Sequence, residues 1–189
     1  MNAVPAAPVC ATESALPDGT LVAIRPLGAD DADALRRFHD GLSRETVYYR
    51  FFCMRGPLTD AEVDYFTGVD QRSRVALAAY IDNTLIGVAR YDRLPRTTDA
   101  EVACVVTDIW QGHGVGTVLL SRLVEIARRS GVRRFVADTL ASNTRMLRLL
   151  ADMSPVRTAD VDHGLAHVLV DIPRPRDRRR DTTERCITG

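Results

Sequence analysis

The chain has 189 residues, 46% apolar and 26% charged, a composition typical of a single globular domain. Its 25 acidic residues balance 25 basic residues, so no net field favours nucleic acid or a membrane as partner. All 25 basic residues are arginine, which excludes Schiff-base catalysis, a Walker lysine and a lysine general base.

The cysteines indicate neither a disulfide framework nor a metal site. Cys10, Cys53, Cys104 and Cys186 are widely separated and form no CxxC pair. No Cys and His spacing suits zinc, so we expect no metal. No apolar run approaches the roughly 18 residues of a membrane helix, and the N-terminus lacks the basic region of a signal peptide. We therefore expect a cytoplasmic protein with reduced thiols.

Composition divides the chain into three parts. Residues 1–19 are rich in Ala and Pro, and we expect a flexible N-terminal arm there. Residues 20–172 carry the periodic patterns of a folded domain. Residues 173–189 are rich in arginine without apolar periodicity, which predicts a disordered tail.

Periodicity within the domain predicts helices and strands in a mixed order. We expect a strand at 20–25, helices at 30–41, 43–52 and 59–68, a strand hairpin at 75–81 and 85–91, a strand at 101–107, a helix at 115–129, a strand at 134–140, a helix at 143–150 and a strand at 165–172. The unit 101–140 should be a parallel, right-handed crossover. The fold class is therefore α/β (α+β), a mixed sheet of about six to seven strands with helices on both faces.

A glycine-rich stretch from Trp110 to Thr117 separates the strand at 101–107 from the following helix. Its glycines let the backbone turn tightly, and the first N–H groups of the helix can then point at phosphate oxygens. The spacing alone also allows a second interpretation, in which the stretch is a simple strand-to-helix turn whose glycines serve only packing. The stretch is neither a Walker loop nor a Rossmann fingerprint.

Within this stretch, Gln111-Gly112-His113-Gly114-Val115-Gly116 resembles the Gln/Arg-x-x-Gly-x-Gly/Ala signature of the GCN5-related N-acetyltransferase (GNAT) family. The resemblance covers about residues 20–172. Four further segments are similar to the acetyltransferase domain of bacterial Pat-type protein-lysine acetyltransferases: Ile24-Arg25-Pro26, Tyr48-Tyr49-Arg50-Phe51-Phe52, Val88-Ala89-Arg90-Tyr91 and Ala100-Glu101-Val102-Ala103. The resemblance implies the GNAT fold, in which the strands 101–107 and 134–140 form a splayed parallel pair beside acetyl-CoA.

The resemblance also implies which residues bind acetyl-CoA. Backbone groups of Cys104, Val105 and Val106 would pair with the pantetheine arm as an added strand does, and an N–H of Val105 or Val106 would bond the thioester oxygen. Asn143 matches a residue that contacts the CoA arm, and it also suits the N-cap of the next helix. The pyrophosphate would lie against the stretch Gln111, Gly112, His113, Gly114, Val115, Gly116 and Thr117. His113 alternatively is an ordinary exposed loop histidine.

Glu101 is the candidate general base. A lysine ammonium, with a pKa of about 10.4, must lose a proton before it attacks a thioester. The apolar neighbours Val102 and Ala103 predict partial burial of Glu101, which would raise its pKa, and the position matches the catalytic glutamate of Pat-type enzymes. A charge at the exposed start of a strand is the alternative. Asp99 and Asp108 are weaker candidates.

These inferences predict an acetyl-CoA-dependent N-acetyltransferase that transfers acetyl directly to an amine, a protein lysine on the resemblance alone. A small-molecule amine acetyltransferase and a non-catalytic acyl-CoA sensor remain open. The helix at 143–150 lacks the tyrosine that many relatives offer as general acid, so that role is unassigned. In similar proteins the aromatic segment at 48–52 borders the acceptor groove. We expect no specific nucleic-acid partner, and either a monomer or a homodimer.

Overall fold

The computed structural model describes residues 10–153 and 156–173, with residues 156–160 described by their backbone alone. Within these ranges no helix combines the length and apolar character needed to cross a bilayer. The elements in order are β1 (Thr12–Ala15), β2 (Leu21–Pro26), a 3₁₀ turn (Ala29–Asp31), α1 (Ala32–Asp40), α2 (Arg44–Phe51), α3 (Asp60–Thr67), β3 (Arg74–Ile81), β4 (Thr84–Arg93), β5 (Asp99–Val106), a second 3₁₀ turn (Asp108–Trp110), α4 (Val115–Arg129), β6 (Arg134–Leu140), α5 (Thr144–Met153), β7 (Val156–Asp162) and β8 (Leu165–Asp171).

The strands form one eight-stranded sheet in the order β1-β2-β3-β4-β5-β6-β8-β7. Every neighbouring pair is antiparallel except β5 and β6, which are parallel as predicted. The mixed α/β architecture is therefore confirmed. The sheet exceeds the predicted six to seven strands because β1 and β7 lie at its two edges. Edge strands need little apolar patterning, since they pair on one side only.

The prediction of a flexible N-terminal arm is wrong for the residues from Thr12 onward. Thr12–Ala15 pairs with β2 in the register Thr12↔Ile24 to Ala15↔Leu21. The next residue, Leu16, is buried in the core at 3% exposure. Residues 1–9 of the arm, and residues 174–189 of the predicted tail, lie outside the described residues.

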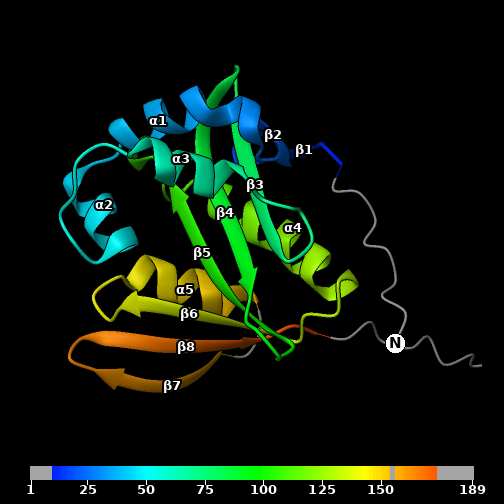
Figure 1. The fold of residues 1–189 in the computed structure, drawn as a ribbon, viewed down its shortest axis with the longest axis vertical. Coiled ribbons are helices and arrows are strands. Elements are labelled where there is room, and N and C mark those ends of the chain that lie inside the picture. The colour runs from blue at the N-terminus through cyan, green and yellow to red at the C-terminus, as the bar shows by residue number, and fades with distance from the viewer. Residues whose placement is uncertain (1–9, 154–155, 174–189) are drawn as a thin grey trace, which may run out of the picture.

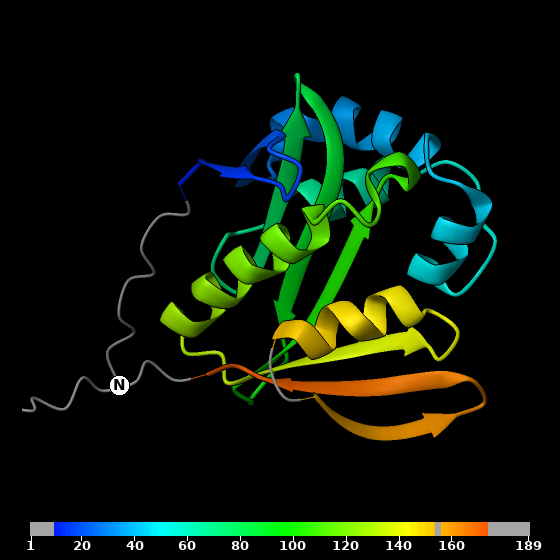
Figure 2. The ribbon, with the colours of Figure 1, turned by 180° about the vertical axis from the view of Figure 1, so that it is seen from behind.

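The helices cover both faces of the sheet, as Figures 1 and 2 show from opposite sides. On one face α1 and α3 pack their apolar residues, among them Leu35, Phe38 and Val63, on β3 and β4. On the other face α4 and α5 pack against the centre of the sheet and against β6 and β8, with Leu119, Leu123 and Leu150 buried. Alternate residues of each central strand therefore face two separate cores.

Local signals place the connections where the sequence predicts them. Asp82 and Asn83 both adopt positive φ in the two-residue turn between β3 and β4, as a type I′ turn requires. At the start of α3, the Thr59 hydroxyl accepts the N–H of Glu62 at 3.3 Å, and the Glu62 carboxylate accepts the N–H of Thr59 at 2.9 Å. This reciprocal pair is the predicted capping box.

Candidate active site

The two parallel strands β5 and β6 are paired at one end only. Their aligned pairs are Asp99↔Arg134, Ala100↔Phe135 and Glu101↔Val136. At the paired end an Arg134–Asp99 ion pair of 2.7 Å joins the strands. Beyond Glu101 the strands diverge, β5 remaining with β4 and β6 remaining with β8 (Figure 1). The predicted splayed pair is therefore present, with Glu101 at its vertex.

The diverging stretch of β5 has a strand partner on one side only within the described part of the chain. Val102 to Val106 pair with β4 but have no partner in β6. The stretch includes Cys104, Val105 and Val106, whose backbone we expected to bind the pantetheine arm. The side chains of Val102, Cys104 and Val106 pack toward α4, and Ala103 and Val105 face the side of α1, as the alternation predicted.

The glycine stretch leads from this strand into α4 through two left-handed residues. Gly112 has φ +81° and Gly114 has φ +92°, conformations that disfavour any residue with a Cβ. Gly114 is the N-cap of α4, so no side chain caps the helix, and the first turn contains no acidic residue. The N–H groups of Val115, Gly116 and Thr117 consequently have no partner within the helix. Such a helix end favours an anion.

The side chain of Gln111 makes hydrogen bonds within the protein. Its Nε2 donates to the Val106 carbonyl and to the Thr46 hydroxyl, each at 3.0 Å, and its Oε1 accepts from Arg145 at 2.6 Å. Its backbone N–H donates to the Asp108 carbonyl at 3.2 Å. Gln111 thus joins β5, α2 and α5 around the opening.

The other predicted cofactor residues lie around the same opening. His113 is exposed, and its Nδ1 lies 3.1 Å from the Gln111 carbonyl oxygen. Val115 is buried while Thr117 is exposed at the start of α4. Asn143 accepts the Met146 N–H through Oδ1 at 3.1 Å, so it serves as the helix cap that the sequence predicted for α5.

Glu101 is exposed, so the predicted partial burial is wrong. The physical reason is its place at the vertex, where the divergence of the strands leaves that face open. Its carboxylate lies close enough to Arg50 of α2 for its charge to favour the protonated guanidinium, without forming an ion pair. Glu101 therefore has both solvent access and a cationic neighbour.

The two weaker acidic candidates, one at the start of β5 and one after its end, have structural partners. Asp99 is paired with Arg134, as described above. Asp108 accepts the Ser43 N–H at 2.9 Å, the Ser43 hydroxyl at 2.6 Å and the Thr46 hydroxyl at 2.7 Å. Desolvation by burial raises the pKa of the Asp108 carboxyl, but these hydrogen bonds outweigh it, so the pKa lies below its ordinary value. Asp108 thus fixes the start of α2 over the site.

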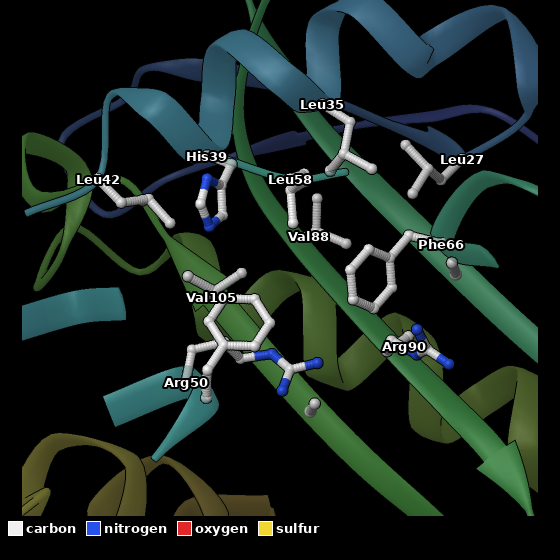
Figure 3. Close-up of a pocket in the computed structure, with 13 residues that line it drawn as sticks. Leu27, Leu35, His39, Leu42, Arg50, Leu58, Phe66, Val88, Arg90 and Val105 are labelled. Atoms are coloured by element: carbon white, nitrogen blue, oxygen red, sulfur yellow. The ribbon is translucent and has the colours of Figure 1, made fainter. Parts of the chain in front are cut away.

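Helix α2 contributes residues that sequence reasoning did not assign a role. It packs against both β5 and β6, across the opening. Arg50 projects from it toward a small cavity that also receives His39 of α1 (Figure 3). The only sequence signal for Arg50 was its place in the aromatic segment 48–52. Among the described residues, no three His, Cys, Asp or Glu side chains gather as they would around a metal ion.

Comparison with known proteins agrees with this geometry. The family model described as "Acetyltransferase (GNAT) family" matches residues 40–153. The chain is 31% identical to Acetyltransferase PA5475 of Pseudomonas aeruginosa over 151 residues, 78% of this chain and 81% of that protein. It is 31% identical to Acetyltransferase Pat of Mycolicibacterium smegmatis over 176 residues, 87% of this chain but only 52% of that protein.

A solved structure agrees as well. The GNAT domain of S. lividans PAT superposes with a TM-score of 0.81 at 34% identity, covering 85% of this chain and 96% of that domain. The splayed strands, the uncapped helix behind a glycine turn, and these matches lead to one conclusion. The chain belongs to the GNAT family of acetyltransferases.

Proposed function

We propose that this acetyl-CoA-dependent acetyltransferase modifies lysine side chains of proteins. The observation that carries the proposal is the exposure of Glu101 at the vertex of the splayed strands, where the side chain of a second protein can reach it.

An apolar rim beside the site supports a protein acceptor. Tyr48 within α2, and Phe52 and Met54 just after it, are 41%, 40% and 52% exposed. Exposed apolar side chains of this size commonly contact a partner protein. The resemblance to Pat-type protein-lysine acetyltransferases points the same way.

The cosubstrate would lie across the opening between β5 and β6. Acetyl-CoA supplies an activated acetyl thioester there. Backbone groups of Cys104 and Val105 would bond the pantetheine arm, while the Val106 carbonyl already accepts from Gln111. The free N–H groups at the start of α4 would bind the pyrophosphate, helped by the Thr117 hydroxyl.

Glu101 would act as the general base. The lysine ammonium gives a proton to the Glu101 carboxylate, directly or through water, and the amine nitrogen bonds to the acetyl carbon. The carbon–sulfur bond breaks and the CoA thiolate leaves; the nitrogen releases its second proton to solvent to give the neutral amide, and the thiolate takes a proton from solvent. An exposed carboxylate suits this role because it can release the proton to solvent after each turnover.

Replacing the carboxylate by an amide tests the role of Glu101. Glu101→Gln should bind acetyl-CoA as wild type does in calorimetry and lose about 10²-fold or more in kcat, the scale of general-base catalysis. Raising the pH should recover part of that loss, since free lysine amine becomes more abundant. Glu45→Gln, an exposed glutamate on α2, is the matched control and should keep full activity. Equal activity of Glu101→Gln and wild type would refute the assignment.

Labelled acetyl-CoA added to cell lysate identifies the acceptor class. Label on lysines of proteins supports the proposal. Label confined to small amines would replace it with a small-molecule acetyltransferase. Tight acetyl-CoA binding without any labelled product would favour a non-catalytic sensor.

A further inference from the structure

A small cavity lies between helices α1, α2 and α3 and strands β3, β4 and β5 (Figure 3). Its volume is about 40 Å³. Most of its lining is apolar, yet three nitrogen-bearing side chains, His39, Arg50 and Arg90, border it. No acidic residue lines it within the described part of the chain. Because Arg90 is paired with Asp92, Arg50 alone gives the cavity a cationic side, and this side suits an anion.

His39 is a buried polar side chain without a hydrogen-bond partner among the described residues. It is 5% exposed, and neither ring nitrogen makes a hydrogen bond with a described residue. The Asp40 carboxylate lies 3.6 Å from Nδ1, beyond hydrogen-bond distance. In Figure 3 the ring points from α1 into the cavity. Buried polar groups in native proteins are almost always satisfied, so this ring indicates a missing ligand.

Arg50 is a cation whose neighbouring carboxylates, those of Glu101 and Asp92, act on it only from a distance. It makes no ion pair or hydrogen bond with any residue the structure describes, and its guanidinium lies 5.0 Å from the Phe51 ring centroid. Arg90 differs, because it is bonded to Asp92 and to the Tyr65 hydroxyl. Burial and the like charge of Arg90 lower the pKa of Arg50 to about 10, so it stays charged at neutral pH.

The cavity adjoins the proposed catalytic position along β5. Ala103 and Val105 line it and lie two and four residues beyond Glu101 on the same face of the strand. At about 3.3 Å per residue, these positions are roughly 7 and 13 Å from Glu101. A volume near 40 Å³ holds about three water-sized atoms, which is the size of a carboxylate group.

We propose that Arg50 and His39 form a carboxylate-binding subsite that selects acceptors with an acidic side chain beside the target lysine. The inference deepens the proposed protein-lysine function and rests on it. The distance along β5 from Glu101 to the cavity suits an acceptor whose carboxylate lies several bonds away from the reacting lysine amine. Arg50 supplies the charge, and a ring N–H of His39 supplies a second donor.

Peptides test the preference. Three peptides of one sequence carry Glu, Gln or Arg beside a single lysine, and kcat/KM is measured for each. Wild type should prefer the Glu peptide over the Gln peptide by about 10-fold, and Arg50→Gln should reduce that ratio to about 1, because charged hydrogen bonds have this strength. Arg44→Gln removes an exposed charge from the same helix and should keep the wild-type ratio. Arg50→Glu should favour the Arg peptide.

A binding measurement separates the subsite from turnover. Protein labelled with ¹⁵N-histidine is titrated with formate, and the His39 resonances are assigned with His39→Phe. Formate should shift these resonances in wild type and leave them unchanged in Arg50→Gln. If no peptide is acetylated but formate shifts His39, the lysine function fails and the anion subsite stands.

Two results would overturn the inference. One is equal kcat/KM on the Glu and Gln peptides together with no response of His39 to formate, which would mean that water fills the cavity. The other is an Arg50-dependent preference for free lysine over its methyl ester without any preference among peptides. That result would mean that the subsite binds the carboxylate of a small-molecule acceptor such as a free amino acid.

Discussion

The Nε2 of Gln111 donates to the carbonyl oxygen of Val106 at 3.0 Å, so the second residue of the glycine stretch is bonded to the last residue of β5. The same side chain bonds Thr46 of α2 and Arg145 of α5. Three elements that surround the opening between β5 and β6 are thus connected through one amide. This places Gln111 in a supporting role for the site.

Gln111→Ala should destabilise the fold and weaken cosubstrate binding together. Loss of these hydrogen bonds should lower the free energy of unfolding by about 1–3 kcal/mol in urea denaturation. The Kd for acetyl-CoA should rise severalfold in calorimetry, because the glycine stretch is no longer held to β5. Gln71→Ala is the control: Gln71 donates to the Leu27 and Ala76 carbonyls away from the site. It should lose stability and keep its affinity, and an equal loss of affinity would contradict the role of Gln111.

The two glycines around the start of α4 should respond differently to alanine. Gly114 has φ +92°, and an added Cβ would lie 2.9 Å from the Pro17 ring, so Gly114→Ala should cost about 1–3 kcal/mol. An added Cβ at Gly116 meets only the flexible end of Leu149 at 3.0 Å, and alanine favours the helix. Thermal denaturation should therefore rank Gly114→Ala well below Gly116→Ala. Equal midpoints would contradict the conformation of the glycine stretch.

The Asp108 carboxylate should make part of the stability pH-dependent. Its pKa is lowered from 3.8, because the hydrogen bonds from Ser43 and Thr46 outweigh desolvation. A depressed folded-state pKa contributes stability above the ordinary value and loses it as the pH falls through the lower folded value. Asp108→Asn should thus be less stable than wild type at pH 7, and the difference should shrink below about pH 4. Asp64→Asn, at an exposed site on α3, is the matched control in the same urea titrations.

Cys104 should be a poor nucleophile despite its position beside the site. Burial raises the pKa of its thiol to about 12, and the charge of Arg50 opposes this only in part. Iodoacetamide at pH 8 should therefore label exposed Cys53 at least 10-fold faster than Cys104, as peptide mass spectrometry would record. Acetyl-CoA should leave no acetyl thioester on Cys104. Detection of one would replace direct transfer with a covalent route.

Sequence reasoning succeeded where the signal is local. The Asp82–Asn83 turn, the capping box at Thr59 and the alternation of faces along β5 each depend on residues a few positions apart. The glycine stretch was identified for the same reason, because its turn and its helix start are adjacent in the chain.

The features that the sequence did not predict depend on contacts between residues far apart in the chain, which no local pattern encodes. Asp108 bonds Ser43 across 65 residues, and this contact places α2, and with it Arg50, over the opening. The exposure of Glu101 follows from where β5 and β6 part, which their apolar patterns do not specify. The polar strand β1 is stabilised by its pairing with β2, so its own residues carry little strand signal.

The parting of β5 and β6 also has a consequence for cooperativity. Because β6 pairs with β8 along its whole length, the sheet consists of a five-strand part and a three-strand part that share only three aligned pairs. Such weakly joined parts commonly exchange amide hydrogens as separate units. A molecule bound between them would couple their opening, so occupancy of the site should slow hydrogen exchange in β8 as well as in β6, although β8 does not border the opening.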